Sequence, residues 1–158
     1  MDISFVTEEG RFNYRVCAII VDEGRILAMH DERSPYYYLP GGRVKMGERA
    51  EDAVVREVRE ELGIEAKVLR PLWLSQSFFN EDVDRMDFHE LCLYFLMDHS
   101  ETGLLARGDG FTRREGRRTH AFQWLPFERL RDEYFYPLFL KTEIFRLPET
   151  LTLRTDRE

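Results

Sequence analysis

The segment from Glu48 to Leu62 constrains the fold of this chain more than any other. It contains no proline or glycine, and its apolar residues recur at the spacing of an amphipathic helix. These residues are Val54, Val55, Val58 and Leu62. Gly63 follows at a position where glycine commonly ends a helix. The sequence therefore predicts a helix that buries one face in a core and stops at Gly63.

Three glutamates, Glu57, Glu60 and Glu61, fall on one arc of this helix. On a wheel of about 100° per residue they span roughly 100°, and the apolar arc lies directly beside them. We expect them at the rim of the buried surface, where their mutual repulsion is poorly screened. Arg56 can neutralise part of this charge. An ordinary charged surface helix, an intrahelical ion-pair ladder and a divalent metal site are the competing interpretations.

The loop before the helix favours a ligand site. Pro40, Gly41 and Gly42, followed by Gly47, bring backbone with little side-chain bulk towards the N-terminal end of the helix. Amide groups and a partial positive charge favour an anion there. We therefore expect the glutamates and this loop to form one site.

The rest of the chain alternates between strands and helices. We expect strands at residues 14–21 and 25–30, joined as a hairpin by the turn at 22–24, and at 66–79 and 88–97, joined across the polar residues 80–87. Residues 100–119 indicate a long loop, 121–125 a short strand, and 126–131 and 138–147 helices, whereas residues from Pro148 on should fray. This order predicts a single α/β domain over residues 1–158, with helices packed on a mixed sheet.

Composition limits the partners. The net charge of −7 and the pI near 5.2 argue against a nucleic-acid or membrane surface, both of which need a basic patch. A basic cluster does occur in the predicted loop, and a solvated face is its more common meaning; its residues are Arg113, Arg114, Arg117 and Arg118. The first residues lack the pattern of a secretory signal, and no segment is long enough to span a bilayer, so a cytoplasmic location is expected.

The run from Gly42 to Ile64, GRVKMGERAEDAVVREVREELGI, resembles the signature of the Nudix hydrolases. The signature positions are Gly42, Glu48, Arg56, Glu57, Val58, Glu60, Glu61, Gly63 and Ile64, and each is filled. One departure is Lys45, because many relatives carry a further glutamate near this point of the loop.

The resemblance implies a Nudix fold, an α/β/α sandwich on a mixed sheet in which the signature forms a loop, a helix and a loop. It also implies a metal-dependent hydrolase that cleaves a nucleoside diphosphate linked to a group X into a nucleotide and phospho-X. The expected cofactor is Mg²⁺, with Mn²⁺ as the alternative. The expected partner is a nucleotide-derived small molecule, and relatives often form homodimers.

Carried over by position, Glu57, Glu60 and Glu61 would be metal ligands, assisted by Glu48 and the carbonyl oxygen of Gly42. Arg56 would orient the carboxylates by ion pairing.

The general base is less determined, because relatives take it either from the helix or from a glutamate outside the signature. Glu115, in the predicted loop, is our candidate, although a solvated loop residue is the more common meaning. Glu90 lies in an apolar strand, where its carboxylate needs a partner such as Arg15 or a role in the site.

Candidates for substrate contact are Arg15, Tyr37, Tyr38, Phe78, Phe79 and Glu90. The residues after the signature, WLSQSFFNEDVDR, match none of the markers for ADP-ribose, NADH or dinucleoside polyphosphates, so group X is open. Two alternatives to hydrolysis are a regulatory module that binds nucleotides without turnover and an isopentenyl-diphosphate isomerase. The isomerase ranks last because Cys17 and Cys92 are expected to be buried.

Overall fold

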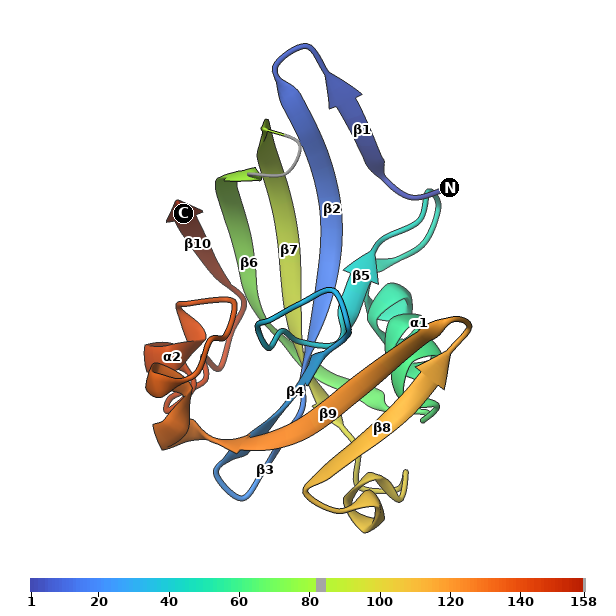
Figure 1. The fold of residues 1–158 in the computed structure, drawn as a ribbon. Coiled ribbons are helices and arrows are strands. Elements are labelled where there is room, and N and C mark those ends of the chain that lie inside the picture. Colours follow the sequence, from blue (N-terminus) through green and yellow to red (C-terminus); the bar gives the residue numbers. More distant parts are fainter. Residues whose placement is uncertain (82–84, 158) are drawn as a thin grey trace.

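The computed structural model describes residues 1–81 and 85–157, and within them the strands form two sheets. The larger sheet has the order β1 (Ser4–Thr7), β2 (Gly10–Ile19), β7 (Met86–Asp98), β6 (Lys67–Glu81) and β10 (Thr152–Arg157), with β5 (Gly41–Arg43) also paired to β2 (Figure 1). The smaller sheet has the order β3 (Val21–Asp22), β4 (Arg25–His30), β9 (Arg118–Pro126) and β8 (Gly110–Glu115).

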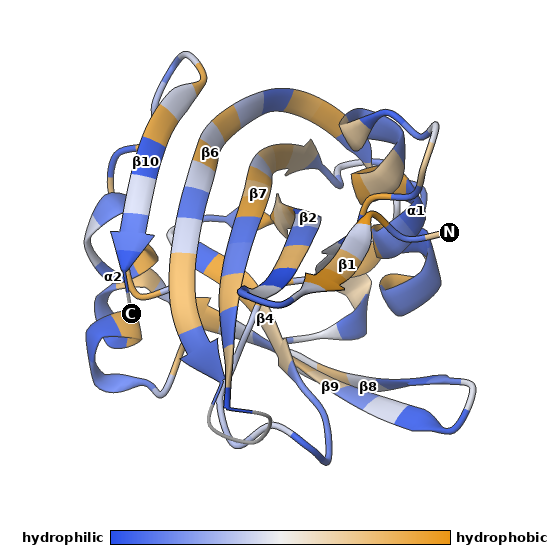
Figure 2. Cartoon of the chain, turned by 90° about the horizontal axis from the view of Figure 1, so that it is seen from above, coloured by the Kyte–Doolittle hydropathy of each residue, from blue (hydrophilic) through white to orange (hydrophobic). Residues whose placement is uncertain are grey.

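The larger sheet is mixed, as expected. Strand β2 runs parallel to β7, and β10 runs parallel to β6, whereas β6 and β7 are antiparallel. Hydrophobic and hydrophilic residues alternate along β6 and β7 in Figure 2, which is the pattern of strands whose two faces have different surroundings.

Helical segments cover both faces of this sheet. On one face, helix α1 (Ala50–Leu62) packs Val54, Val58 and Leu62 against a cluster that includes Val16 and Phe95. On the other face a second cluster joins the sheet to the 3₁₀ helix η2 (Phe127–Asp132) and to α2 (Leu140–Glu143); it includes Ile19, Trp73, Tyr94, Leu130, Phe135 and Leu140. The predicted α/β/α sandwich is confirmed.

Helix α1 follows the predicted periodicity closely. It begins at Ala50, two residues after Glu48, and ends at Gly63, whose φ of 70° is left-handed and whose N–H donates to Arg59 O. Val54, Val58 and Leu62 are buried, as the wheel predicted. Val55 is only half-buried at the edge of the same core.

The predicted hairpin at residues 14–30 is wrong in its pairing. Strand β2 belongs to the larger sheet, and only the short β3 pairs with β4, through Val21–Ile26 and Asp22–Arg25. Because β2 is flanked by β7 and by β1 and β5, its hydrogen bonds are made elsewhere. The second hairpin is confirmed in β6 and β7, although residues 82–84 of its connection lie outside the described residues.

Residues 100–119 are not a long loop. They contain the 3₁₀ helix η1 (Leu104–Arg107), strand β8 and the start of β9. Strand β8 is an edge strand in which exposed and half-buried residues alternate, so it lacks the apolar pattern that marks a buried strand.

The C-terminal region also differs from expectation. The helix expected at 138–147 is only the four-residue α2, and the helix expected at 126–131 is the 3₁₀ segment η2. The expected fraying tail instead contains β10, which pairs with β6 from Trp73 to Phe78. Backbone pairing orders this polar strand, and a hydrogen bond of 2.6 Å from Ser75 Oγ to Asp156 Oδ2 reinforces it.

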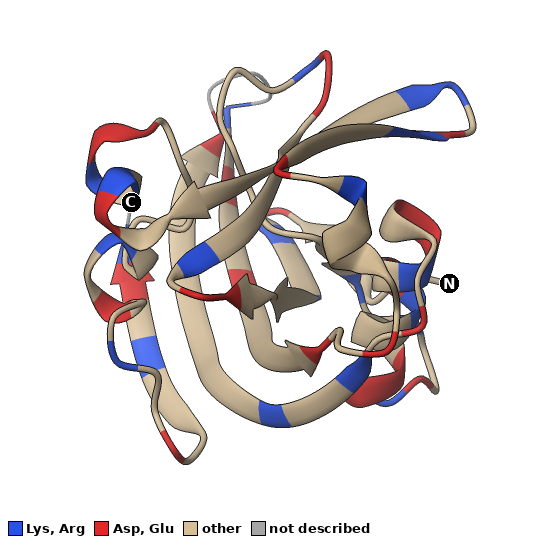
Figure 3. Ribbon diagram, turned by 90° about the horizontal axis from the view of Figure 1, so that it is seen from below, with Lys and Arg blue, Asp and Glu red and all other residues tan. Residues whose placement is uncertain are grey.

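Two surface features bear on partners. Acidic and basic residues are interspersed over the fold in Figure 3. In the part of the chain that the structure describes, no helix is both long enough and apolar enough to cross a membrane.

Candidate active site

The glutamates of α1 lie at the rim of the core, where the wheel placed them. Glu61 is buried, with 7% of its surface exposed, whereas the side chains of Glu57 and Glu60 are 15% and 42% exposed. The three carboxylates, on two adjacent turns of the helix, therefore range from buried to solvent-exposed. A ligand that approaches from solvent needs this arrangement.

Arg56 connects these carboxylates. Its Nε and Nη2 donate to both oxygens of Glu48 at 2.8 and 3.0 Å, and its Nη1 donates to Glu57 at 2.9 Å and to Glu60 at 3.4 Å. Nη2 also donates to the carbonyl oxygen of Arg43 at 3.1 Å. The predicted ion pairing of Arg56 is thus present, and it ties the loop to the helix.

The two glycines before the helix both lie against these carboxylates. The N–H of Gly41 donates to Glu61 Oε1 at 2.9 Å. A Cβ on Gly42 would collide with the carboxylate of Glu57. Strand β5 therefore approaches α1 as closely as it does only because residue 42 lacks a side chain.

Burial raises the pKa of two of these carboxylates. Burial, followed by the charge of Glu57 and then that of Glu115, raises the pKa of Glu61 well above its usual value, although the bond from Gly41 lowers it. Burial also raises the pKa of Glu57, against the lowering effect of Arg56. Within the described residues no basic side chain forms an ion pair with Glu61. Arg56 therefore compensates Glu57 and Glu60, whereas Glu61 has no ion-pair partner among the described residues.

Glu115 approaches this cluster from the β8–β9 hairpin. Arg113 Nη1 donates to Glu60 O at 2.6 Å, and Arg107 Nη1 donates to Leu62 O at 2.7 Å. These two guanidinium groups satisfy carbonyls at the C-terminal end of α1. Arg113 holds the hairpin against the helix, and Arg107 does the same for η1, which precedes β8. Arg113 was expected on a solvated face, and it is instead an anchor. The charge of Glu115 consequently reaches Glu61.

The donor set suits a hard divalent cation. Among the described residues, no three carboxylate, imidazole or thiol side chains already surround one point at ligand distances. Mg²⁺ needs only one or two direct carboxylates, however, and retains several waters. Three glutamates provide that set. Glu61 is buried and has no cationic partner among the described residues, Glu57 is half-buried, and Glu60 is exposed. Glu48 is engaged by Arg56, so its contribution would be through water.

Arg15 and Glu90 lie on the sheet beside this cluster. Glu90 accepts a hydrogen bond of 3.3 Å from Asn13, which is its partner on β2. Burial alone would lower the pKa of Arg15, but the charge of Glu90 is the largest of the effects that raise it above its usual value. Arg15 Nε is buried with no hydrogen-bond partner in the described structure. Arg15 thus retains a free donor close to the glutamates.

The two predicted tyrosines have different positions. The hydroxyl of Tyr38 donates to Asp31 Oδ2 at 3.4 Å, and burial and the charge of Asp31 raise the pKa of Tyr38 to about 12. Glu61 contributes to the same shift, so Tyr38 borders the site. Tyr37 instead packs on the second core cluster and on His30, at 5.2 Å between ring centroids.

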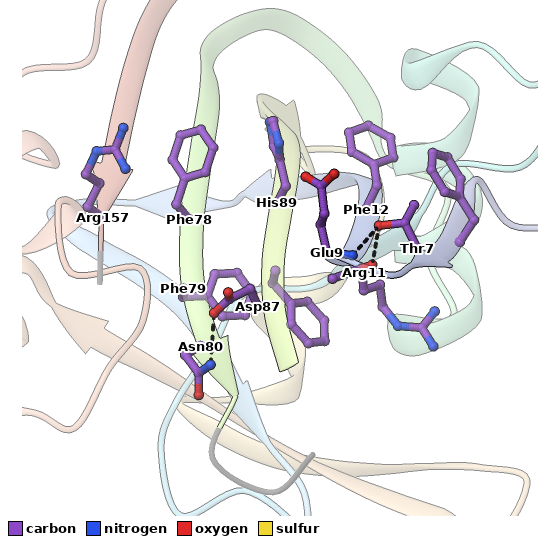
Figure 4. Close-up of a pocket in the computed structure, with 13 residues that line it drawn as sticks. Thr7, Glu9, Arg11, Phe12, Phe78, Phe79, Asn80, Asp87, His89 and Arg157 are labelled. Carbon is purple, nitrogen blue, oxygen red and sulfur yellow. Dashed lines mark hydrogen bonds between the residues drawn. The ribbon is translucent and has the colours of Figure 1, made fainter. Parts of the chain in front are cut away.

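Phe78 and Phe79 lie away from the glutamates. Both line an open cavity of about 660 Å³ at the end of the sheet formed by the first residues of β2, whereas Gly41 and Gly42 pair near its last residues. Figure 4 shows Phe78, His89 and Phe12 in a row across neighbouring strands of this cavity. Phe79 stacks on Phe88 at 5.0 Å. The structure does not bring either phenylalanine to the glutamate cluster of α1.

Sequence reasoning missed several residues near the site. Asp31 and His120 are buried, and both contact residues that were predicted. Tyr36 packs against Tyr38, Tyr134 and Tyr136 at 5.1 to 6.2 Å. The repeated tyrosines were visible in the sequence. They come together, however, through the backbone pairing of residues 37 and 135, which is a tertiary contact.

Two named proteins resemble part of this chain in sequence. A protein from Methanocaldococcus jannaschii named ADP-ribose pyrophosphatase is 36% identical over 86 residues, which is 52% of this chain and 48% of that protein. A Caenorhabditis elegans protein named putative nudix hydrolase 1 is 36% identical over 77 residues, which is 44% of this chain and 21% of that protein. The chain thus spans about half the length, or less, of these curated relatives.

Solved structures share the fold. A MutT Nudix hydrolase from Burkholderia pseudomallei has 26% identity and a TM-score of 0.53, covering 84% of this chain and 94% of that one. A MutT protein from Bacillus halodurans has a TM-score of 0.59, covering 90% and 89%, and its 14% identity shows the fold alone. Residues 11–141 match the family model of the NUDIX domain. With the glutamates, Arg56 and the glycine loop assembled at one end of α1, the chain belongs to the Nudix family.

Proposed function

We propose that this chain is a metal-dependent hydrolase that cleaves the diphosphate linkage of a nucleoside diphosphate joined to a group X. Water attacks at phosphorus, and the products are a nucleotide and phospho-X. The observation that supports this most strongly is Glu61, a buried carboxylate beside two other glutamates and without a basic partner in the described part of the chain. A divalent cation and the phosphates it accompanies supply what this cluster lacks.

The residues of the chain divide the work. Glu57, Glu60 and Glu61 would hold Mg²⁺, or Mn²⁺, with Glu48 assisting and the carbonyl oxygen of Gly42 as a further donor. The metal, when bound, neutralises phosphate charge and activates water. Arg56 keeps Glu48 and Glu57 in place through three hydrogen bonds of 2.8 to 3.0 Å. Arg15, which is half-buried beside the glutamates, would contact a phosphate oxygen through its guanidinium group.

Glu115 is the proposed general base. Its carboxylate lies within the electrostatic reach of Glu61, and its side chain is 38% exposed, so water can reach it. In the reaction, Glu115 accepts a proton as water forms a bond to phosphorus, and the bond from phosphorus to the leaving phosphate oxygen breaks. Glu90 is the weaker candidate because its charge acts mainly on Arg15, whereas that of Glu115 acts on Glu61.

The substrate is a nucleotide derivative whose group X is open. Tyr38 borders the glutamates, and Tyr36 beside it offers a ring for stacking at the same end of the fold. The relatives bear names that refer to ADP-ribose, to UDP linked to X and to nucleoside triphosphates, which defines a short panel of substrates.

The test is a product analysis. The purified protein is incubated with Mg²⁺ and ADP-ribose, UDP-sugars, nucleoside triphosphates or dinucleoside polyphosphates, and the products are identified by mass spectrometry. We expect at least one compound to yield a nucleotide and phospho-X, and EDTA to stop the reaction. Tight nucleotide binding with no product across the panel would replace this proposal with the regulatory module.

A cytoplasmic location and a homodimer are part of the same proposal. Gel filtration with light scattering would report the mass of the assembly, and fractionation of cells would report the location. A monomeric mass would remove the dimer without affecting the hydrolase.

A further inference from the structure

His120 is a buried polar residue that the reaction outlined above does not use. It lies on β9 with 2% of its surface exposed, and its Nε2 is 2.9 Å from Glu115 Oε1. Its other ring nitrogen, Nδ1, is also buried and has no hydrogen-bond partner among the described residues.

The register of the hairpin points these side chains towards α1. His120 pairs directly with Arg113, which binds a carbonyl at the end of α1, and Glu115 is two residues from Arg113 on the same strand. Directly paired residues and residues two apart on a strand project from the same face of a sheet. Arg113, Glu115 and His120 therefore share the face of the hairpin that meets the catalytic helix.

Packing alone does not account for a histidine here. A buried polar atom without a partner destabilises a fold, and a phenyl ring would fill a similar volume without that penalty. The neighbour Phe122, at 6.3 Å between ring centroids, shows that this face accepts aromatic side chains. What the imidazole adds over a phenyl ring is the N–H that it can donate to Glu115.

We infer that His120 is a positioning residue that holds Glu115 in the orientation required of the general base. Glu115 is the last residue of β8, beside the turn at Gly116, and its side chain would otherwise sample several rotamers in solvent. The bond from His120 occupies Oε1, so Oε2 is the oxygen that accepts the proton of the attacking water. This inference rests on the proposed function, and it concerns how the base is held rather than which substrate is cleaved.

A double-mutant cycle tests the inference on the full chain, with the substrate identified in the panel. The variants are His120→Phe, Glu115→Gln and the double substitution, each measured for kcat, KM and Tm. We expect His120→Phe to lower kcat about tenfold with KM changed less than about twofold, and Glu115→Gln to lower kcat about a hundredfold. Because His120 acts through Glu115, the double variant should match Glu115→Gln within about twofold.

Two further variants keep the result interpretable. His120→Gln retains an N–H donor and should recover most of the lost kcat. If His120→Phe does not fold, His120→Leu, which also lacks the donor, takes its place in the cycle. His99→Phe is the matched control, because His99 also has a buried Nδ1 without a partner in the described structure and contacts Val21 O and Trp124 rather than the site. We expect His99→Phe to leave kcat unchanged.

The outcomes separate the inference from the proposed function. A double variant in which the two losses multiply, or a His120→Phe variant with the kcat of the wild type, would overturn the positioning role. If Glu115→Gln is fully active, the base is elsewhere and the inference fails, although the hydrolase does not. No turnover by the wild-type protein across the panel would instead overturn the proposed function itself.

Discussion

Replacing Arg56 by methionine tests whether this residue holds the glycine-rich loop and helix α1 together. Arg56 has 16% of its side chain exposed and donates to Glu48, Glu57 and the carbonyl oxygen of Arg43 at 2.8 to 3.1 Å. Methionine keeps a similar apolar stem but removes each of these donors. Glu48 and Glu57, whose side chains are 16% and 15% exposed, would then be left without the guanidinium.

The magnitude follows from this burial. Removing one partner of a buried ion pair costs about 3–5 kcal/mol. The lower end, about 3 kcal/mol, applies here because the site is partly solvated, and the bonds of 3.4 Å to the 42% exposed Glu60 add little. For a domain of this size 1 kcal/mol shifts Tm by about 2–4 °C, so Tm should fall by about 6–12 °C. Arg56→Lys keeps the charge but not the forked geometry and should lose about half as much.

The assay is calorimetric unfolding in EDTA, supported by urea titration, so that metal binding does not contribute. Arg49→Met, at the N-cap of the same helix, is the matched control. Arg49 also forms two hydrogen bonds to a carboxylate, that of Asp52, but its side chain is 70% exposed. The Tm of this variant should match that of the wild type, because an exposed ion pair contributes little to stability. A loss below about 1 kcal/mol for Arg56→Met, or equal losses for both variants, would refute the role given to Arg56.

Three further predictions concern the same cluster. Because the folded-state pKa of Glu61 is raised, its contribution to stability is present below the unfolded pKa of about 4.3 and is lost as pH rises through the folded pKa. In EDTA at pH 7–8, Glu61→Gln should therefore have a higher Tm than the wild type, with the difference smaller at pH 5; equal Tm values at both pH values would contradict this. Gly42→Ala should displace the Glu57 carboxylate and lower kcat at least about tenfold, while Tm changes by less than about 4 °C. Unaltered kinetics would show that the close approach of residue 42 to Glu57 is dispensable. Arg113→Met removes the 2.6 Å bond to Glu60 O, so amide exchange in residues 110–115 should accelerate and kcat should fall severalfold, and unchanged exchange would mean that Arg113 is no anchor.

The sequence was most informative where local periodicity and burial agree. The spacing of Val54, Val58 and Leu62 determined which face of α1 is buried, and Gly63 determined its end. The same wheel placed the glutamates at the edge of the core, and Glu61 is indeed buried there. These features depend on one helix and its own side chains, so they could be read without knowledge of the rest of the fold.

Features that depend on pairing between distant segments could not be predicted in this way. Strand β8 is a solvated edge whose polar residues hid it, and the proximity of Glu115 to Glu61 arises only when Arg107 and Arg113 dock on the end of α1. Strand β10 is ordered by its pairing with β6, which is distant in the sequence. The hydrogen-bonded residues Ser75 and Asp156, for example, are 81 positions apart. We predicted Phe79 near the site because it ends the expected strand. The structure instead places this end of β6 at the opposite end of the sheet from the glutamates.

The most direct test of the account is the dependence of turnover on Mg²⁺ in the wild type, Glu60→Gln and Glu61→Gln. Each protein is titrated with Mg²⁺ at a saturating concentration of the substrate found in the panel, and circular dichroism confirms the fold. We predict that wild-type turnover rises from none in EDTA to saturation, and that each glutamine variant retains the fold but loses at least about a hundredfold in kcat. Wild-type turnover in both variants, or turnover that persists in EDTA, would contradict the assignment of these glutamates to a catalytic metal.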